Sequence, residues 1–110
     1  MDGLCALGDG EFEVEGQRIV VEGGRAARHD GTLAGSGVML DRMVNNVAHW
    51  LPVRLEEAVR MATLSPAAVL GMSDRKGRIA PGADADLVVL DEGLEVAMTF
   101  VRGERVFSRE

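Results

Sequence analysis

Few side chains of this sequence are suited to metal binding or nucleophilic catalysis. The only histidines, His29 and His49, lie 20 residues apart, whereas metal sites are built from ligands clustered at short spacing. The single cysteine, Cys5, has no second cysteine with which to form a disulfide or a thiolate pair. We therefore expect surface or capping roles for the histidines, a partly buried free thiol at Cys5, and no metal bound by this chain alone.

Three aspartates stand out by their positions. Asp84 and Asp86 flank a turn that leads into an apolar run. Short carboxylates at such places commonly accept backbone N–H bonds, and this capping role is favoured over catalysis. Asp2 stands near the start of the chain, before small and apolar residues that would not solvate it. Composition alone predicts a disordered terminus there.

The run GTLAGS at 31–36 carries no ionisable group. It is either a tight connector or backbone that a ligand approaches closely, because small side chains leave main-chain N–H and C=O groups accessible. A helix beginning after Ser36 would aim further free N–H groups at such a ligand. From these residues alone, the connector is the favoured interpretation.

Composition excludes several classes of function. The chain has 12 basic and 18 acidic residues and a pI near 4.9, which gives no electrostatic case for binding nucleic acid or an anionic membrane. G-x-G-x-x-G, a P-loop and a nucleophile elbow are missing from the sequence, as are a membrane span and a signal peptide. We expect a cytoplasmic protein. Its four aromatic residues and 14 glycines suggest a piece of something larger, because little large apolar surface offsets the chain entropy.

The chain reads as an α+β fragment, with an N-terminal β meander, central helices and C-terminal strands. In the first 30 residues, alternation and turns at 16–17, 23–24 and 30–31 predict strands. Apolar residues at intervals of three and four predict helices over 37–50 and 54–63, with Ser36 as N-cap of the first. Ser65-Pro66 and Gly71 frame a third helix at 66–70. The stretches 87–91 and 95–101, with a closing hairpin, read as strands.

Five stretches, in this order, resemble the C-terminal part of N-acetylglucosamine-6-phosphate deacetylases, which are members of the metal-dependent amidohydrolase superfamily. They are DGLCALGDGEFEVEGQRIVVEGGRA, HDGTLAGS, LEEAVRMATLSPAAVLG, KGRIAPGADADLVVLD and VRGERVF. The fourth stretch and the closing hairpin resemble many amidohydrolases. DGTLAGS and the helix after it are closer to the deacetylases.

The resemblance implies a fold in which a (β/α)8 barrel carries a small β-sandwich built from both chain ends. On this mapping, 1–36 supply the end of barrel strand eight, the β meander and a substrate loop. The helices over 37–71 close the barrel, and 76–108 supply sandwich strands. The resemblance also implies that Asp2 is the general base that activates water for attack on the acetamide and then protonates the leaving amine. The substrate-contact residues would be Leu33, Ala34, Gly35 and Ser36.

In the full-length family a divalent metal, zinc or iron, and the groups that hold the sugar phosphate depend on residues upstream of this segment. We therefore expect the isolated chain to be inactive. Its uncovered helix stripes and open strand edges predict a homodimer or higher self-association. Two alternatives stay open: a non-catalytic assembly module, and part of another amidohydrolase such as a dihydroorotase-like enzyme.

Overall fold

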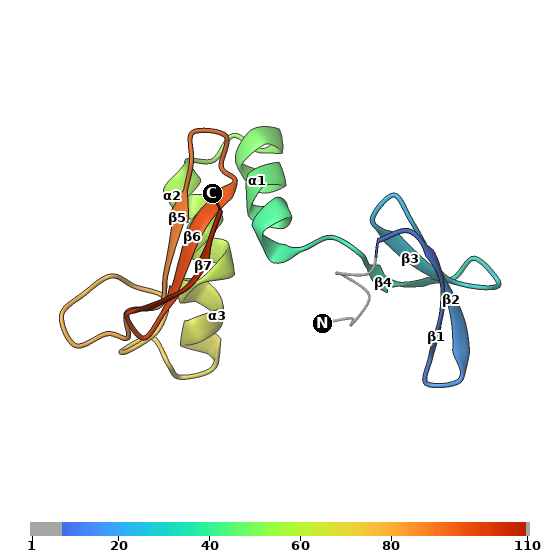
Figure 1. Ribbon diagram of the computed structural model, residues 1–110, viewed down its shortest axis with the longest axis horizontal. Helices are drawn as coiled ribbons and strands as arrows, with labels where there is room; N and C mark the ends of the chain where they lie inside the picture. The colour runs from blue at the N-terminus through green and yellow to red at the C-terminus, as the bar shows by residue number, and fades with distance from the viewer. Residues whose placement is uncertain (1–7, 110) are drawn as a thin grey trace. The chain divides into compact units, whose positions relative to one another are not determined.

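The computed structural model describes residues 8–109. It confirms an α+β architecture, with two small antiparallel sheets and three short helices in this part of the chain (Figure 1). The chain forms two compact units, residues 1–42 and 43–110. The expected end of a barrel strand at the start of the chain, with Asp2 and Cys5, lies outside the described residues.

The first unit contains the predicted β meander. Strands β1 (Gly10–Val14), β2 (Gln17–Glu22), β3 (Arg25–Arg28) and β4 (Leu33–Ser36) lie in the order β1-β2-β3-β4. The turns at 15–16 and 23–24 have positive φ at both positions, as the two-residue turns that match strand twist require. The first turn falls one residue earlier than predicted, and the second falls where it was predicted.

Residues 33–36 form a strand, which corrects the connector interpretation. The register pairs Ala26 with Gly35 and Ala27 with Leu33, so Ala34 is the extra residue of a bulge. Residues 33–36, Leu-Ala-Gly-Ser, include no β-branched or aromatic residue, so the sequence pattern does not show a strand. Pairing with β3, rather than propensity, makes this segment extended.

A small core lies on one face of this sheet. Ile19 and Val21 are buried at alternate positions of β2, together with Ala26 of β3, and Phe12 packs against them. Alternation places these side chains on the same face of the strand. The core fixes the register of β2 and β3, since a slip by one residue would expose both β2 side chains.

The predicted helices are present with shifted starts. They are α1 (Leu40–Trp50), α2 (Leu55–Ala62) and α3 (Leu64–Val69). Ser36 is not the N-cap of α1. It is the last residue of β4, where it pairs with Arg25 of β3, and it lies four residues before the helix begins. Helix α3 begins two residues before Pro66. Proline is tolerated there because N–H groups of the first turn have no intrahelical partner.

Gly71 takes the predicted left-handed position just after the end of α3. This glycine has φ of 69°, and its N–H donates to Ala68 O at 3.1 Å while the Met72 N–H donates to Ala67 O at 2.8 Å. These two hydrogen bonds make a Schellman motif, which satisfies carbonyls that the helix end leaves open.

The second unit ends in a three-stranded antiparallel sheet. Strands β5 (Leu87–Leu90), β6 (Val96–Val101) and β7 (Glu104–Ser108) lie in the order β5-β6-β7. A turn at Arg102–Gly103, again with positive φ at both residues, joins β6 to β7. The strands predicted over 87–91 and 95–101 and the closing hairpin are confirmed.

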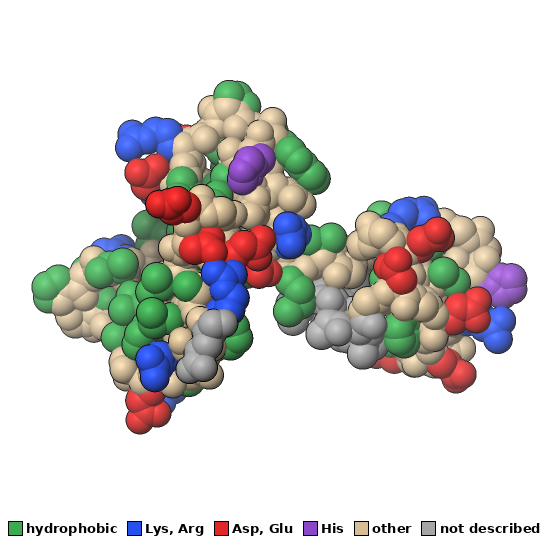
Figure 2. Space-filling model, turned by 45° about the horizontal axis from the view of Figure 1, so that its top comes forward, with side chains coloured by type: hydrophobic (Ala, Val, Ile, Leu, Met, Phe, Trp, Pro, Cys, Tyr) green, Lys and Arg blue, Asp and Glu red, His purple; other side chains and the backbone are tan. Residues whose placement is uncertain are grey.

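Much apolar surface stays bare in the described residues. No residue of α1 is buried, and α2 buries only Ala58. Leu40 is 56% exposed and Leu55 is 38% exposed. Figure 2 shows green apolar side chains at the surface of the part that holds the helices. No helix within 8–109 is long and apolar enough to span a membrane.

Candidate functional site

Strand β4 is the strongest candidate for a ligand-contacting segment in the described residues. It is the last strand of its sheet, so one of its edges pairs with β3 and the other pairs with no strand of that sheet. Backbone groups on such an edge can bind an external partner. The bulge at Ala34 interrupts the regular alternation, a feature common beside functional sites.

Hydrogen bonds from both backbone and side chains hold the turn before β4. The Thr32 N–H donates to Asp30 Oδ1 at 2.9 Å, and the Arg28 N–H donates to Thr32 O at 2.7 Å. The guanidinium of Arg25 donates to Gly31 O at 3.2 Å. The hydrogen bond from the Thr32 backbone is the main cause that lowers the pKa of Asp30 below its ordinary value. A carboxylate therefore fixes the point where β4 begins.

The chain after β4 passes closely over the turn between β2 and β3. The Gly37 N–H donates to Gly24 O at 2.8 Å, and Ser36 Oγ accepts from the Val38 N–H at 3.0 Å. A Cβ atom at Gly24 would lie 2.8 Å from Val38 Cγ2, closer than two carbon atoms can approach. The glycines at 24 and 37 thus allow two backbone segments to touch, which sets where β4 ends.

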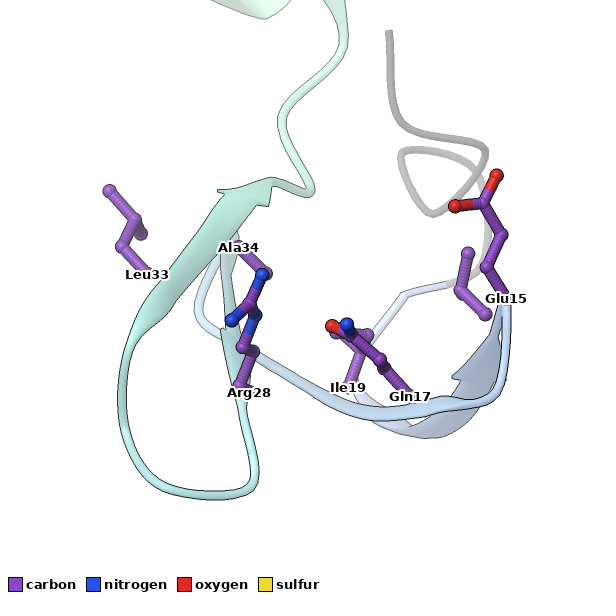
Figure 3. A pocket seen from close by; sticks show the side chains of 7 residues that line it. Glu15, Gln17, Ile19, Arg28, Leu33 and Ala34 are labelled. Atoms are coloured by element: carbon purple, nitrogen blue, oxygen red, sulfur yellow. The ribbon is translucent and has the colours of Figure 1, made fainter.

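A shallow hollow of about 270 Å³ lies beside β4. Apolar residues on three strands line it together with Glu15, Gln17 and Arg28. Figure 3 shows the Arg28 side chain extending from the end of β3 past Ala34, with Leu33 on the other side of β4. The hollow therefore brings one cation and the bulge residue of the candidate segment to the same face of the sheet.

Asp84 and Asp86 converge on Lys76, the only lysine of the chain. Lys76 Nζ lies 2.7 Å from Asp84 Oδ2 and 2.5 Å from Asp86 Oδ2. Asp86 Oδ1 also accepts the Arg102 N–H at 2.9 Å, so this residue accepts a backbone N–H as predicted, but at the turn between β6 and β7 rather than at the turn that it flanks. The ammonium, and then the Arg102 N–H, lower the pKa of Asp86. The two carboxylates raise the pKa of Lys76. This cluster ties the segment before β5 to the turn between β6 and β7.

Asp91 forms a similar set of ion-pair and hydrogen-bond contacts at the other end of β5. Its carboxylate pairs with the guanidinium of Arg109 and accepts the N–H groups of Gly93 at 2.9 Å and Glu95 at 3.0 Å. The Arg109 bond, followed by the Glu95 N–H, lowers the pKa of Asp91. These contacts are structural, since every carboxylate oxygen is used to hold a turn or a strand end.

The two histidines, His29 and His49, belong to different units of the chain. His49 is exposed, as expected for a surface role, and its Nδ1 lies 2.8 Å from Asn45 O, one turn earlier in α1. His29 is exposed at the end of β3. Among residues 8–109, no three His, Cys, Asp or Glu side chains are grouped to hold a metal ion. The described part of the chain therefore does not fit a metal centre.

Leu33–Ser36 stay predicted substrate contacts, and the sequence pattern does not indicate the residues that hold this segment. Arg25, Asp30 and Gly24 act through hydrogen bonds to the turn and to the residues after β4. The pair Asp30-Gly31 was the one available signal, and it predicted the turn correctly. Nothing in the spacing of Arg25 indicates that its side chain reaches Gly31.

The chain belongs to the amidohydrolase family, whose model matches residues 22–106. This family is generally metal-dependent. The match spans β3 and β4 of the first sheet, all three helices, β5, β6 and the start of β7.

Within that family, the chain is similar to N-acetylglucosamine-6-phosphate deacetylases, which confirms the resemblance found in the sequence. It is 38% identical over 109 residues to the deacetylase of Bos taurus, covering 99% of this chain and 25% of that protein. It is 35% identical over 101 residues to the enzyme of Bacillus subtilis, covering 92% of this chain and 26% of that protein. This chain thus spans about a quarter of the length of these relatives.

Solved structures give the same result. The deacetylase of Thermotoga maritima superposes with a TM-score of 0.85 at 38% identity, over 94% of this chain and 28% of that one. A variant of the Mycobacterium smegmatis enzyme, in complex with N-acetyl-D-glucosamine-6-phosphate, superposes with a TM-score of 0.77 at 30% identity. That match covers 91% of this chain and 27% of the other.

Proposed function

We propose that this chain is the C-terminal part of a hydrolase that removes the acetyl group from N-acetylglucosamine 6-phosphate, giving glucosamine 6-phosphate and acetate. The observation that carries the proposal is the match to deacetylases over nearly the whole chain, in both sequence and structure. In the full-length polypeptide the segment would close a (β/α)8 barrel and contribute strands to a small sandwich. Residues 1–36, 37–71 and 76–108 correspond to the barrel-strand end with the substrate segment, the helices and the sandwich strands.

Two parts of the chain have roles in the proposed reaction. Asp2 is the general base: it takes a proton from the attacking water and returns it to the leaving amine, as a carboxylate in this position can do. Leu33, Ala34, Gly35 and Ser36 contact the sugar. The open edge of β4 supports this role, because backbone N–H and C=O groups on that edge are suited to sugar hydroxyls.

The isolated chain is proposed to be inactive. The divalent metal of the full-length enzymes, zinc or iron, would activate the water, and its ligands belong to polypeptide outside this segment. The phosphate of the substrate is likewise held elsewhere. The chain acts in the cytoplasm, and the apolar surface left bare on its helices supports self-association as a homodimer or larger assembly.

Deacetylation assays test the proposal. The 110-residue protein is fused behind the upstream part of the Bacillus subtilis relative, and the fusion is assayed with zinc or iron on N-acetylglucosamine 6-phosphate and its galactosamine epimer. The epimer is included because relatives named as N-acetylgalactosamine-6-phosphate deacetylases match at 35% identity. We expect turnover by the fusion and none by the chain alone.

Replacing the proposed base supplies the control. Asp2→Asn in the fusion should lower kcat by at least about 100-fold while the fusion stays folded, since removing a general base costs about 10²–10⁴-fold. Full activity of this variant would rule out the role of Asp2. A fusion that is folded and metal-loaded but inactive on both sugars would favour a non-catalytic module.

A further inference from the structure

The hollow beside β4 lies at one end of the core face of its sheet. The strand register pairs Phe12 with Ile19, and Ile19 with Arg28, and directly opposed side chains of antiparallel strands point to the same face. Val14 and Gln17 are the next opposed pair on that face. The buried side chain of Ile19, which is 5% exposed, therefore forms a floor with Gln17 and Arg28 beside it.

Three polar side chains that line this hollow hold no part of the described fold. Neither hydrogen bonds nor ion pairs join the side chains of Glu15, Gln17 or Arg28 to another residue within 8–109. In the same unit, by contrast, the side chains of Arg25 and Asp30 hold the turn before β4. The hydrogen-bonding groups of the three lining side chains are thus available to a ligand.

The chemistry of these side chains suits an uncharged ligand with several hydroxyl groups. The guanidinium of Arg28 offers only donors, the carboxylate of Glu15 only acceptors, and the amide of Gln17 both. Figure 3 shows Glu15 and Arg28 at opposite sides of the hollow, with Gln17 between them. Because the two charges offset each other, the hollow favours neither an anion nor a cation. A hydroxyl group can donate to Glu15 and accept from Arg28.

The apolar lining and the size of the hollow fit a single sugar ring. Val14, Ile19 and Ala34 add apolar surface, against which the C–H groups of a sugar ring can pack. The volume of about 270 Å³ lies just below the range of about 300–1,000 Å³ that holds drug-sized ligands. Ala34 also belongs to the segment Leu33–Ser36, which is proposed to contact the substrate.

We infer that this hollow binds the ring of the amino-sugar substrate, with the Arg28 guanidinium donating to its hydroxyl groups and Gln17 and Glu15 completing the contacts. The inference rests on the proposed function for the identity of the sugar. It adds side chains from β2, β3 and the turn before β2 to the backbone contacts proposed for β4. Arg28 is then a specificity-determining residue, since a sugar that lacks the matching hydroxyl leaves its donors unpaired.

An NMR titration of the 110-residue protein tests this inference. The probes are N-acetylglucosamine 6-phosphate, N-acetylglucosamine and inorganic phosphate, each added separately while the backbone amide signals are followed. We expect both sugars to shift the amides of Arg28 and Ala34 with a Kd on the order of 1 mM, as for a small ligand at an open site. Inorganic phosphate should leave these amides unchanged, because Glu15 offsets the charge of Arg28.

Arg28→Ala should raise the Kd for N-acetylglucosamine about tenfold, because hydrogen bonds from a charged donor are lost. Arg18→Ala is the matched control. Arg18 is an exposed arginine of β2 that does not line the hollow, and it precedes Ile19, so its side chain lies on the opposite face of the sheet. The Kd of this variant should stay within about twofold of the unchanged protein, the precision of such a titration. The amide signals of Ile19 and Val21 check that both variants keep the core.

The outcomes separate this inference from the proposed function. Unchanged amides of Arg28 and Ala34 with both sugars, equal weakening by the two variants, or the same shifts with inorganic phosphate would each overturn the inference. Sugar binding that depends on Arg28 supports it even if the covalent fusion is inactive, a result that would count against the proposed function alone. Turnover by the fusion without sugar binding at this hollow would leave the proposed function intact and refute the role of Arg28.

Discussion

At the scale of single residues, Gly77 makes the sharpest steric prediction. Gly77→Ala should destabilise the protein by at least about 2 kcal/mol, because it adds the cost of a left-handed non-glycine residue to that of an overpacked contact. The added Cβ would lie 2.7 Å from Leu64 Cα, which is backbone and cannot rotate away. Urea unfolding followed by circular dichroism measures the change.

Gly82→Ala is the control for Gly77→Ala. Gly82 has φ of 87°, similar to Gly77, but no atom lies within 4 Å of its added Cβ. Gly82→Ala should therefore lower the free energy of unfolding only by the cost of the left-handed backbone conformation, about 1 kcal/mol. Equal losses in the two variants would show that the contact with Leu64 costs nothing.

The ion pairs of Lys76 predict a dependence of stability on pH. The pKa of Asp86 is lowered from its ordinary 3.8, so its interactions stabilise the fold above that pH, and the contribution is lost as pH falls through the lower folded-state value. The pKa of Lys76 is raised from 10.5, so its contribution is present below that pH and lost as pH rises through the higher value. The ion pair between Lys76 and Asp86 is therefore intact across the whole neutral pH range.

Asp86→Asn isolates the charge, because the amide oxygen can still accept the Arg102 N–H. At neutral pH the variant should unfold at a lower urea concentration than the unchanged protein. The difference should shrink below pH 3.8, where the carboxyl of the unchanged protein becomes protonated. A difference that stays constant down to the acid transition would show that the charge of Asp86 does not contribute.

At the scale of elements, the placement of β4 depends on the turn before it. Asp30→Ala removes the acceptor of the Thr32 N–H, and we expect the amides of β4 to exchange with solvent several-fold faster. Asp9→Ala is a matched control, since Asp9 accepts the Gly23 N–H at 3.1 Å at a different turn of the same sheet. Hydrogen exchange followed by NMR distinguishes them: faster exchange in β4 with Asp9→Ala as well would mean that the whole sheet is loosened.

The same elements show how far the sequence alone predicts the structure. Alternation in β1 and β2 and the apolar stripes of the helices depend on periodicity along the chain, so the sequence predicts them. Strand β4 exists through pairing with β3 and through contact at Gly24, which no local pattern encodes. The candidate segment was located through resemblance to a family. Its support by Arg25 and Asp30 became visible only in the fold.

At the scale of the whole molecule, the bare surface predicts the behaviour of the free chain. The stripe of α1 includes Leu40, 56% exposed, and Met43, 38% exposed, and no residue of this helix is buried. Apolar surface of this kind drives association until it is covered. The free chain should therefore show concentration-dependent self-association in sedimentation experiments.

A charge placed within the α1 stripe tests whether this surface causes the association. Leu40→Glu puts an acid at the first position of α1, where it favours the helix, and removes a leucine from each copy of the interface. Losing two buried leucines should weaken a symmetric dimer about 100-fold. His49→Glu adds the same charge on the opposite face of the helix, since nine residues place it about half a turn away from Leu40. Because only the first substitution touches the stripe, equal weakening by both would point to net charge rather than apolar burial as the source of the association.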